Sequence, residues 1–196
     1  MTVQLFHEEL PDGLILVDGY LDQSTQDECI ELIDGHDWGN DLQRRTQHYG
    51  SRYDYATGRA AGQGTAPSPP DLFVEISQRL SDDGYFERPP DQIIVNEYVV
   101  DGDTVQGIGP HRDRTDCFGP AIATISLVEA WAMRFSHERH DHIDVLLATG
   151  SLALMTGAVR YDWQHSIPPR RFERTQNLKV PRRRRVSLTF RSLLVD

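Results

Sequence analysis

Two histidines and one aspartate supply the ligand types of a metal centre. His111 and Asp113 are separated by one residue, and His165 follows about fifty residues later. Because side chains alternate along a strand, His111 and Asp113 would point to the same side and could reach one ion. Two imidazoles and a carboxylate suit ferrous iron and leave open positions for dioxygen and an organic cosubstrate. A His-x-Asp pair is also frequent on protein surfaces, so the pattern needs further support.

A segment near the C-terminus predicts a strand with two different faces. Residues 185–191 have the sequence Arg-Val-Ser-Leu-Thr-Phe-Arg, so arginines and hydroxyls alternate with apolar residues that would face the core. Burying Arg185 and Arg191 on one inward face would be costly without an anionic partner, and a dicarboxylic acid would be such a partner. The alternative is an edge strand with a solvated arginine face, which also fits the run Arg182–Arg184.

A third element adds neutral polar groups. Asn96 and Tyr98 are two residues apart in an apolar stretch, so an amide and a phenol could donate hydrogen bonds into the same cavity. The alternative is an ordinary strand with a buried tyrosine.

The elements that must position these residues follow from the hydrophobic pattern. Residues 14–17 predict a short strand, and residues 24–33 predict a helix with Asp22 and Ser24 as capping candidates. Arg44–Tyr55 is rich in aromatic residues and leads into a loop rich in Gly, Ala and Pro that runs to Pro70. Apolar residues at helical spacing predict a second helix after this loop.

From Gln92 onward the pattern changes to short β-branched and aromatic runs separated by turn signals. Such runs at fairly even spacing favour a sandwich or barrel over a parallel sheet with crossover helices. The expected fold class is therefore mostly β with flanking helices. The predicted strands cover residues 93–99, 122–127, 131–135, 143–147, 152–156 and 186–190.

Composition limits the other possibilities. The 196 residues are 38% hydrophobic, which predicts one domain over residues 1–196. We expect a cytoplasmic protein without a membrane partner, because there is no signal-peptide pattern, no long apolar stretch and only the isolated Cys29 and Cys117. A net charge of −10 argues against general attraction to nucleic acid, although arginines gather between Arg160 and Arg191. The sequence specifies no oligomeric state.

In this order, the motifs resemble those of the AlkB-type Fe(II)- and 2-oxoglutarate-dependent dioxygenases. The set is Asn-x-Tyr at 96–98, His-x-Asp at 111–113, the late His165 and Arg-x-Ser-Leu-Thr-x-Arg at 185–191. Intervening segments fit as well, among them Gly107–His111, Ile122–Leu127 and Arg160-Tyr-x-Trp-x-His165. The resemblance covers Asn96–Arg191 strongly and Arg44–Tyr55 less strongly.

This resemblance implies a double-stranded β-helix (jelly roll) core over residues 91–196, with N-terminal helices and an α/β lid over residues 1–90. It implies that His111, Asp113 and His165 hold Fe(2+), that Arg185 pairs with the distal carboxylate of 2-oxoglutarate, and that the cosubstrate is supported by Asn96, Tyr98 and Arg191. Such enzymes use O2 to convert 2-oxoglutarate to succinate and carbon dioxide while they hydroxylate a substrate, and an N-alkyl group then leaves as an aldehyde.

The substrate side is less determined. Tyr53 and Tyr55 match the place of the lid aromatics on which family members stack a flipped base, and Trp38 or Tyr49 could assist. The alternative role for these tyrosines is packing of the lid onto the barrel. We expect oxidative dealkylation of N-alkylated bases in alkylated DNA or RNA. The alternatives are hydroxylation of a protein side chain or small metabolite, and a degenerate member that only binds.

A histidine cluster at His137, His140 and His142 is a second metal-like pattern. No cysteine partner or helical His-Glu-x-x-His motif accompanies it. We therefore expect a solvated hairpin loop here.

Overall fold

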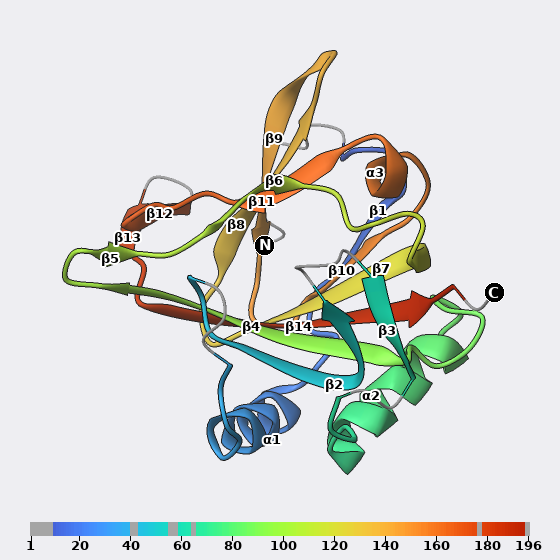
Figure 1. The fold of residues 1–196 in the computed structure, drawn as a ribbon. Coiled ribbons are helices and arrows are strands. Elements are labelled where there is room, and N and C mark those ends of the chain that lie inside the picture. The colour runs from blue at the N-terminus through green and yellow to red at the C-terminus, as the bar shows by residue number, and fades with distance from the viewer. Residues whose placement is uncertain (1–9, 40–42, 55–58, 64–65, 176–177, 195–196) are drawn as a thin grey trace.

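The computed structural model describes residues 10–39, 43–54, 59–63, 66–175 and 178–194. Two antiparallel sheets form the body of the protein, and a two-stranded hairpin lies beside them (Figure 1). The larger sheet has the order β1-β10-β7-β14-β4-β2-β3, with β5 paired to β4, and the smaller sheet has the order β6-β11-β8-β9. The strands of the larger sheet are β1 Leu14–Val17, β2 Thr46–Asp54, β3 Arg59–Gln63, β4 Gln92–Asp101, β5 Thr104–Val105, β7 Phe118–Leu127, β10 Leu152–Met155 and β14 Arg184–Leu193. The strands of the smaller sheet are β6 Ile108–His111, β8 Trp131–His137, β9 His140–Leu147 and β11 Gln164–Ile167, and the hairpin consists of β12 Phe172–Thr175 and β13 Leu178–Pro181.

Two helices cover the outer face of the larger sheet (Figure 1). Helix α1, Gln23–Asp34, begins after Asp22, whose carboxylate accepts a hydrogen bond from the backbone N–H of Thr25 at 2.8 Å. Helix α2, Asp71–Asp82, begins after the Pro69–Pro70 pair. The apolar residues of both helices share one core with the apolar side of β14, and this core includes Ile33, Phe73, Leu80, Val186, Leu188 and Phe190. The polar side of β14 must therefore face the smaller sheet.

A second core fills the space between the two sheets. Tyr98 and Ile122 come from the larger sheet, and Trp131 and Phe135 come from the smaller one. This sheet-on-sheet packing confirms the mostly β, jelly-roll fold class expected from the sequence. Among the helices that the structure describes, none combines the length and the apolar character that crossing a bilayer requires.

Most elements lie where the hydrophobic pattern predicts them, including β1, both long helices and the six strands predicted after Gln92, which are β4, β7, β8, β9, β10 and β14. Residues 59–63 are a correction, because they form β3 inside the stretch expected as a loop. The hydrophobic pattern does not predict β6 or β11, whose sequences Ile-Gly-Pro-His and Gln-His-Ser-Ile lack apolar alternation. The strand expected from the spacing of His111 and Asp113 is present but ends at His111. A short helix, α3, Gly157–Tyr161, was likewise not expected.

The prediction of a hairpin loop at the histidine cluster is wrong in part. His137 ends β8, whereas His140 and His142 belong to β9, so the histidines lie in paired strands and not in a loop. The ring of His140 stacks on Trp163 with centroids 5.6 Å apart and an interplanar angle of 11°. The cluster therefore has a structural explanation as an aromatic contact between the hairpin and the start of β11.

The prediction of a solvated arginine face for Arg182–Arg184 is wrong in part. Arg182 is 2% exposed, and its guanidinium donates to the carboxylate of Glu173 and to the carbonyl of Pro168 while it covers the ring of Trp131. Arg184 pairs with Asp34 and Glu97, which links α1 to the sheet. Only Arg183 fits the expected solvated side chain.

Candidate functional site

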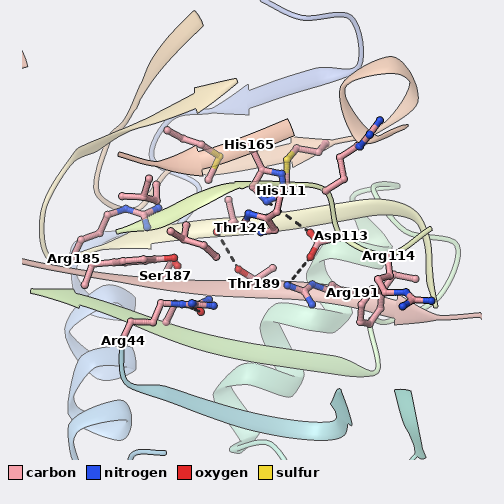
Figure 2. A pocket seen from close by; sticks show the side chains of 18 residues that line it. Arg44, His111, Asp113, Arg114, Thr124, His165, Arg185, Ser187, Thr189 and Arg191 are labelled. Atoms are coloured by element: carbon pink, nitrogen blue, oxygen red, sulfur yellow. Dashed lines mark hydrogen bonds and ion pairs between the residues drawn. The ribbon is translucent and has the colours of Figure 1, made fainter. Parts of the chain in front are cut away.

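A cavity of about 240 Å³ lies between the two sheets. Its lining includes every residue that the sequence assigned to metal or cosubstrate, brought from β4, β6, β11, β14 and the turn after β6 (Figure 2). These residues are Asn96, Tyr98, His111, Asp113, His165, Arg185 and Arg191. Segments separated by up to 95 residues in sequence, from Asn96 to Arg191, thus meet at one site.

The candidate metal ligands come together through strand pairing. His111 on β6 and His165 on β11 are opposite each other in the antiparallel register, and their ring centroids are 4.3 Å apart. The carboxylate Oδ2 of Asp113 lies 3.9 Å from Nε2 of His165. Strand β6 ends at His111, so Asp113 follows it in a turn, and strand alternation alone does not explain its direction.

The protonation states of these groups suit metal binding. Nδ1 of His111 lies 2.9 Å from the carbonyl of Gly109, so in the neutral tautomer that donates there, Nε2 keeps its lone pair. Burial lowers the pKa of His165 to about 4, so its imidazole is neutral at pH 7. Burial by itself would raise the pKa of Asp113, but the charges around the carboxylate, led by that of Arg191, together outweigh burial and hold that pKa below its ordinary value.

The rotamers of the site do not yet form a coordination sphere. Within the part of the chain that the structure describes, no three His, Cys, Asp or Glu side chains meet the geometry of a metal centre. The Asp113 carboxylate instead pairs with Nη2 of Arg191 at 3.0 Å (Figure 2). Two imidazoles and an ionised carboxylate bordering one cavity nevertheless provide the donor chemistry that a divalent ion requires.

Arg185 lies toward the other end of the cavity (Figure 2). Its side chain is 1% exposed, its Nη2 donates to Oγ of Ser126 at 2.8 Å, and its Nε has no hydrogen-bond partner. Burial lowers the pKa of Arg185 to about 10, so the group stays protonated at neutral pH. No carboxylate among the described residues forms a salt bridge with it. A buried cation in this state is suited to an anionic ligand.

The wall between these two ends carries hydroxyl groups. Ser187 and Thr189 alternate with the apolar residues of β14 and line the cavity, as the sequence predicts. Oγ1 of Thr189 lies 3.4 Å from Oγ1 of Thr124 on the neighbouring strand β7 (Figure 2). Hydroxyls that have only such a long contact can turn toward a polar ligand.

Three arginines of the site were not identified from the sequence. Arg44 precedes β2, and its Nε donates to Oδ1 of Asn96 at 2.8 Å. Arg112 and Arg114 flank Asp113, line the cavity and are exposed. Alternation within a strand cannot reveal Arg44, because its position depends on the pairing of β2 with β4. The position of Arg112 and Arg114 on either side of a candidate ligand was the available signal.

The lid aromatics have different outcomes. Tyr53 lies in β2 with its backbone opposite Ala60 of β3, and Tyr55 lies outside the described residues. Tyr49 is 4% exposed and packs edge-on against Phe73 of α2 with centroids 5.6 Å apart. Its expected assistance in substrate binding is therefore wrong, because the ring belongs to the core under α2.

Trp38 is not among the residues that line the cavity. The guanidinium of Arg45 covers its ring at 4.7 Å from the centroid, and the same guanidinium binds the carboxylate of the buried Glu97. Trp38 thus supports an ion pair at the edge of the larger sheet.

Comparison with known proteins extends these observations. The family model described as the 2OG-Fe(II) oxygenase superfamily matches residues 16–191. The protein named tRNA (carboxymethyluridine(34)-5-O)-methyltransferase ALKBH8 of Mus musculus is 30% identical over an alignment of 177 residues that covers 86% of this chain but only 26% of that protein. The chain therefore spans about a quarter of the length of this relative.

Two further matches cover a larger share of the compared protein. Alpha-ketoglutarate-dependent dioxygenase alkB homolog 7, mitochondrial, of Mus musculus is 29% identical over 193 residues, with 94% of this chain and 80% of that protein covered. The solved structure titled OsALKBH1 superposes with a TM-score of 0.64 at 19% identity, covering 94% of this chain and 100% of the other. At this identity the structural similarity concerns the fold alone.

Proposed function

Because this chain belongs to the 2OG-Fe(II) oxygenase superfamily, as a dioxygenase of the AlkB type, we propose that it oxidatively removes alkyl groups from base nitrogens in DNA or RNA. Enzymes of the superfamily use Fe(2+), 2-oxoglutarate and O2. The observation that carries the proposal is the single cavity in which two histidines, a carboxylate and a buried unpaired arginine meet.

In the proposed site, His111, Asp113 and His165 hold the iron. Bound iron and 2-oxoglutarate supply an oxidation in which the cosubstrate becomes succinate and carbon dioxide, and a hydroxylated N-alkyl group then leaves as an aldehyde. Arg185 binds the distal carboxylate of the cosubstrate by charge-assisted hydrogen bonds. Arg191 must give up its contact with Asp113 or share it when the metal binds.

The remaining lining residues orient the reactants and exclude water. Asn96 and Tyr98 present an amide and a phenol to the cosubstrate, and the apolar side chains of Ile108, Met133 and Met155 form part of the wall. A largely apolar wall strengthens the electrostatic contacts of the bound acid and limits side reactions with water.

Nucleic acid as the substrate is supported by charge at the cavity. The chain has a net charge of −10, yet Arg44, Arg112 and Arg114 all line this cavity. Asp116 offsets the charge of Arg114, whereas Arg44 and Arg112 form no salt bridge with any residue that the structure describes. Cations without acidic partners are suited to phosphates. The name of the mouse relative also refers to tRNA, and we propose that Tyr53 and Tyr55 stack the target base.

Turnover with matched oligonucleotides tests this proposal. Succinate and aldehyde should form in equal amounts with N-methylated RNA or DNA strands, and unmethylated strands of the same sequence should give only background succinate. His111→Ala should give neither product. A full set of alkylated DNA and RNA strands that fails to stimulate the wild-type enzyme would refute nucleic acid as the substrate.

One observation favours a second candidate. The acidic surface as a whole repels a polyanion, which would suit a hydroxylase of a protein side chain or a small metabolite on the same scaffold. In that case 2-oxoglutarate turnover would still depend on His111 but would be stimulated by a non-nucleic acid substrate.

A further inference from the structure

Arg160 is a buried cation whose hydrogen-bond partners are all backbone carbonyls. Its side chain is 3% exposed. Nη1 donates to the carbonyl of Asp113 at 2.7 Å, Nη2 donates to those of Arg114 and Phe118 at 3.2 and 3.3 Å, and Nε lies 3.4 Å from that of Gly119. One guanidinium thus contacts four carbonyls.

These carbonyls belong to the two ends of one turn. Residues 113–119 begin with the candidate ligand Asp113 and lead into β7, and the N–H of Phe118 donates to the carbonyl of Arg114 at 3.1 Å. No carboxylate of the described residues forms a salt bridge with Arg160. A planar guanidinium offers five N–H donors in a fixed arrangement, whereas a lysine ammonium offers three on a flexible stem. The contact pattern therefore requires arginine in particular.

The helix that carries Arg160 is itself fixed to the body of the protein. In α3 the N–H of Val159 donates to the carbonyl of Asp12 at 2.9 Å, and just before it the N–H of Thr156 donates to that of Gly13 at 2.9 Å. Gly13 has φ +86°, and a Cβ there would lie 2.0 Å from the carbonyl oxygen of Thr156, so this close approach requires glycine. The strand that holds His165 begins only three residues after α3 ends.

We infer that Arg160 is a positioning residue that fixes the turn bearing Asp113 relative to the strand bearing His165. Its guanidinium holds the turn that supplies Asp113, and its own helix leads directly into the strand that supplies His165. The side chain of Arg160 is not part of the cavity lining. The inference rests on the proposed metal site. It explains how a ligand that lies beyond the end of β6 can have a defined direction.

Metal binding by Arg160→Lys tests the inference without turnover. Mn(II) is used as the probe ion, and its affinity is measured by calorimetry in the absence of cosubstrate. Outer partners that orient ligands typically contribute 10- to 100-fold in metal affinity, so the variant should bind Mn(II) at least about tenfold more weakly. Hydrogen exchange at the amides of residues 114–119 should become faster, while the circular dichroism spectrum stays that of the wild type.

Arg182→Lys is the matched control. Arg182 is equally buried and also donates to a backbone carbonyl, but it lies against Glu173 and Trp131, outside the cavity. This variant should have a lower melting temperature with an unchanged Mn(II) affinity. If Arg160 only supported the fold, both variants would lose stability and both would keep their affinity for Mn(II).

The outcomes separate the two hypotheses. Unchanged Mn(II) affinity in a folded Arg160→Lys protein overturns the role of Arg160 and leaves the metal site intact. A wild-type protein that binds no divalent ion refutes the metal site, and the inference fails with it. If the variant does not fold, exchange in the metal-free wild type decides, because an unprotected amide at Phe118 would mean that the turn is not held.

Discussion

Replacement of Arg185 by methionine should separate cosubstrate binding from stability. The side chain is fully buried, has one hydrogen bond to Ser126 and has no acidic partner among the residues that the structure describes. Methionine has similar length and no charge. The variant should therefore lose the contact with a dicarboxylic acid, while the cavity wall stays filled.

Arg185→Met should weaken cosubstrate binding without lowering the stability of the ligand-free protein. A charge-assisted hydrogen bond to a carboxylate contributes about 2–4 kcal/mol, which corresponds to an increase of roughly 30- to 900-fold in the KM for 2-oxoglutarate. In the protein without ligand, a buried and unpaired guanidinium costs free energy. The free energy of unfolding of ligand-free Arg185→Met should therefore stay equal to that of the wild type or rise.

The assay compares this variant with Arg182→Met. Arg182 is equally buried but is paired with Glu173, so its replacement leaves this buried carboxylate with only the more distant Arg170, at 3.7 Å, as a cationic partner among the described residues and should cost up to about 3–5 kcal/mol of stability. Its KM for 2-oxoglutarate should not change. Succinate formation at varied cosubstrate concentration gives the KM values, and urea unfolding without ligand gives the stabilities.

Two results would refute this reasoning. A KM for 2-oxoglutarate that is unchanged in Arg185→Met would mean that the cosubstrate carboxylate binds elsewhere. A ligand-free Arg185→Met protein as destabilised as Arg182→Met would mean that Arg185 has a structural partner and is not held in reserve for an anion.

Three further predictions concern the ligand, the lid and an ion pair. Asp113→Ala should abolish Mn(II) binding in calorimetry and lower the melting temperature of the metal-free protein, since Arg191 loses its partner at 3.0 Å; retained binding would exclude Asp113 as a ligand. Tyr53→Ala should raise the KM for an alkylated oligonucleotide but not that for 2-oxoglutarate, and equal oligonucleotide KM values would remove Tyr53 from the substrate site. Burial would raise the pKa of Asp144, but hydrogen bonds from Arg134 and Arg170 lower it to about 2. Because this carboxyl takes up a proton more readily in the unfolded chain, Asp144→Asn should lose about 1–2 kcal/mol at pH 7 in urea unfolding, and the difference should shrink as the pH falls from about 4 toward 2; a difference independent of pH would contradict this.

The cavity-facing residues of β4 and β14 could be predicted from the sequence for a simple physical reason. Apart from the ion pair between Glu97 and Arg184, both strands are apolar on the side that packs under the helices. On the opposite side, Asn96, Tyr98, Arg185 and Arg191 are polar residues at period two. Strands β6 and β11 could not be predicted in this way. Both are short and largely polar, and His111 and His165 face a polar site, so the usual alternation is missing.

Other assignments failed because a partner far along the chain decides them. The run at residues 182–184 has the composition of a solvated segment, yet Glu173 in the neighbouring hairpin draws Arg182 inside. A tyrosine at position 49 is equally compatible with stacking on a base and with packing against a helix. The position of Phe73 in α2 determines that Tyr49 packs against the helix. Such pairings depend on tertiary contacts that no local pattern encodes.

Strand β14 is the last strand in sequence but lies in the middle of the larger sheet, between β7 and β4. Until it is inserted, those two strands present unpaired edges, which favour aggregation, and the cavity lacks both Arg185 and Arg191. Because insertion of this strand joins distant parts of the chain, it requires a large loss of chain entropy. A ligand that needs these arginines would bind only completed molecules, so addition of 2-oxoglutarate during refolding would draw the population toward the finished sheet by mass action.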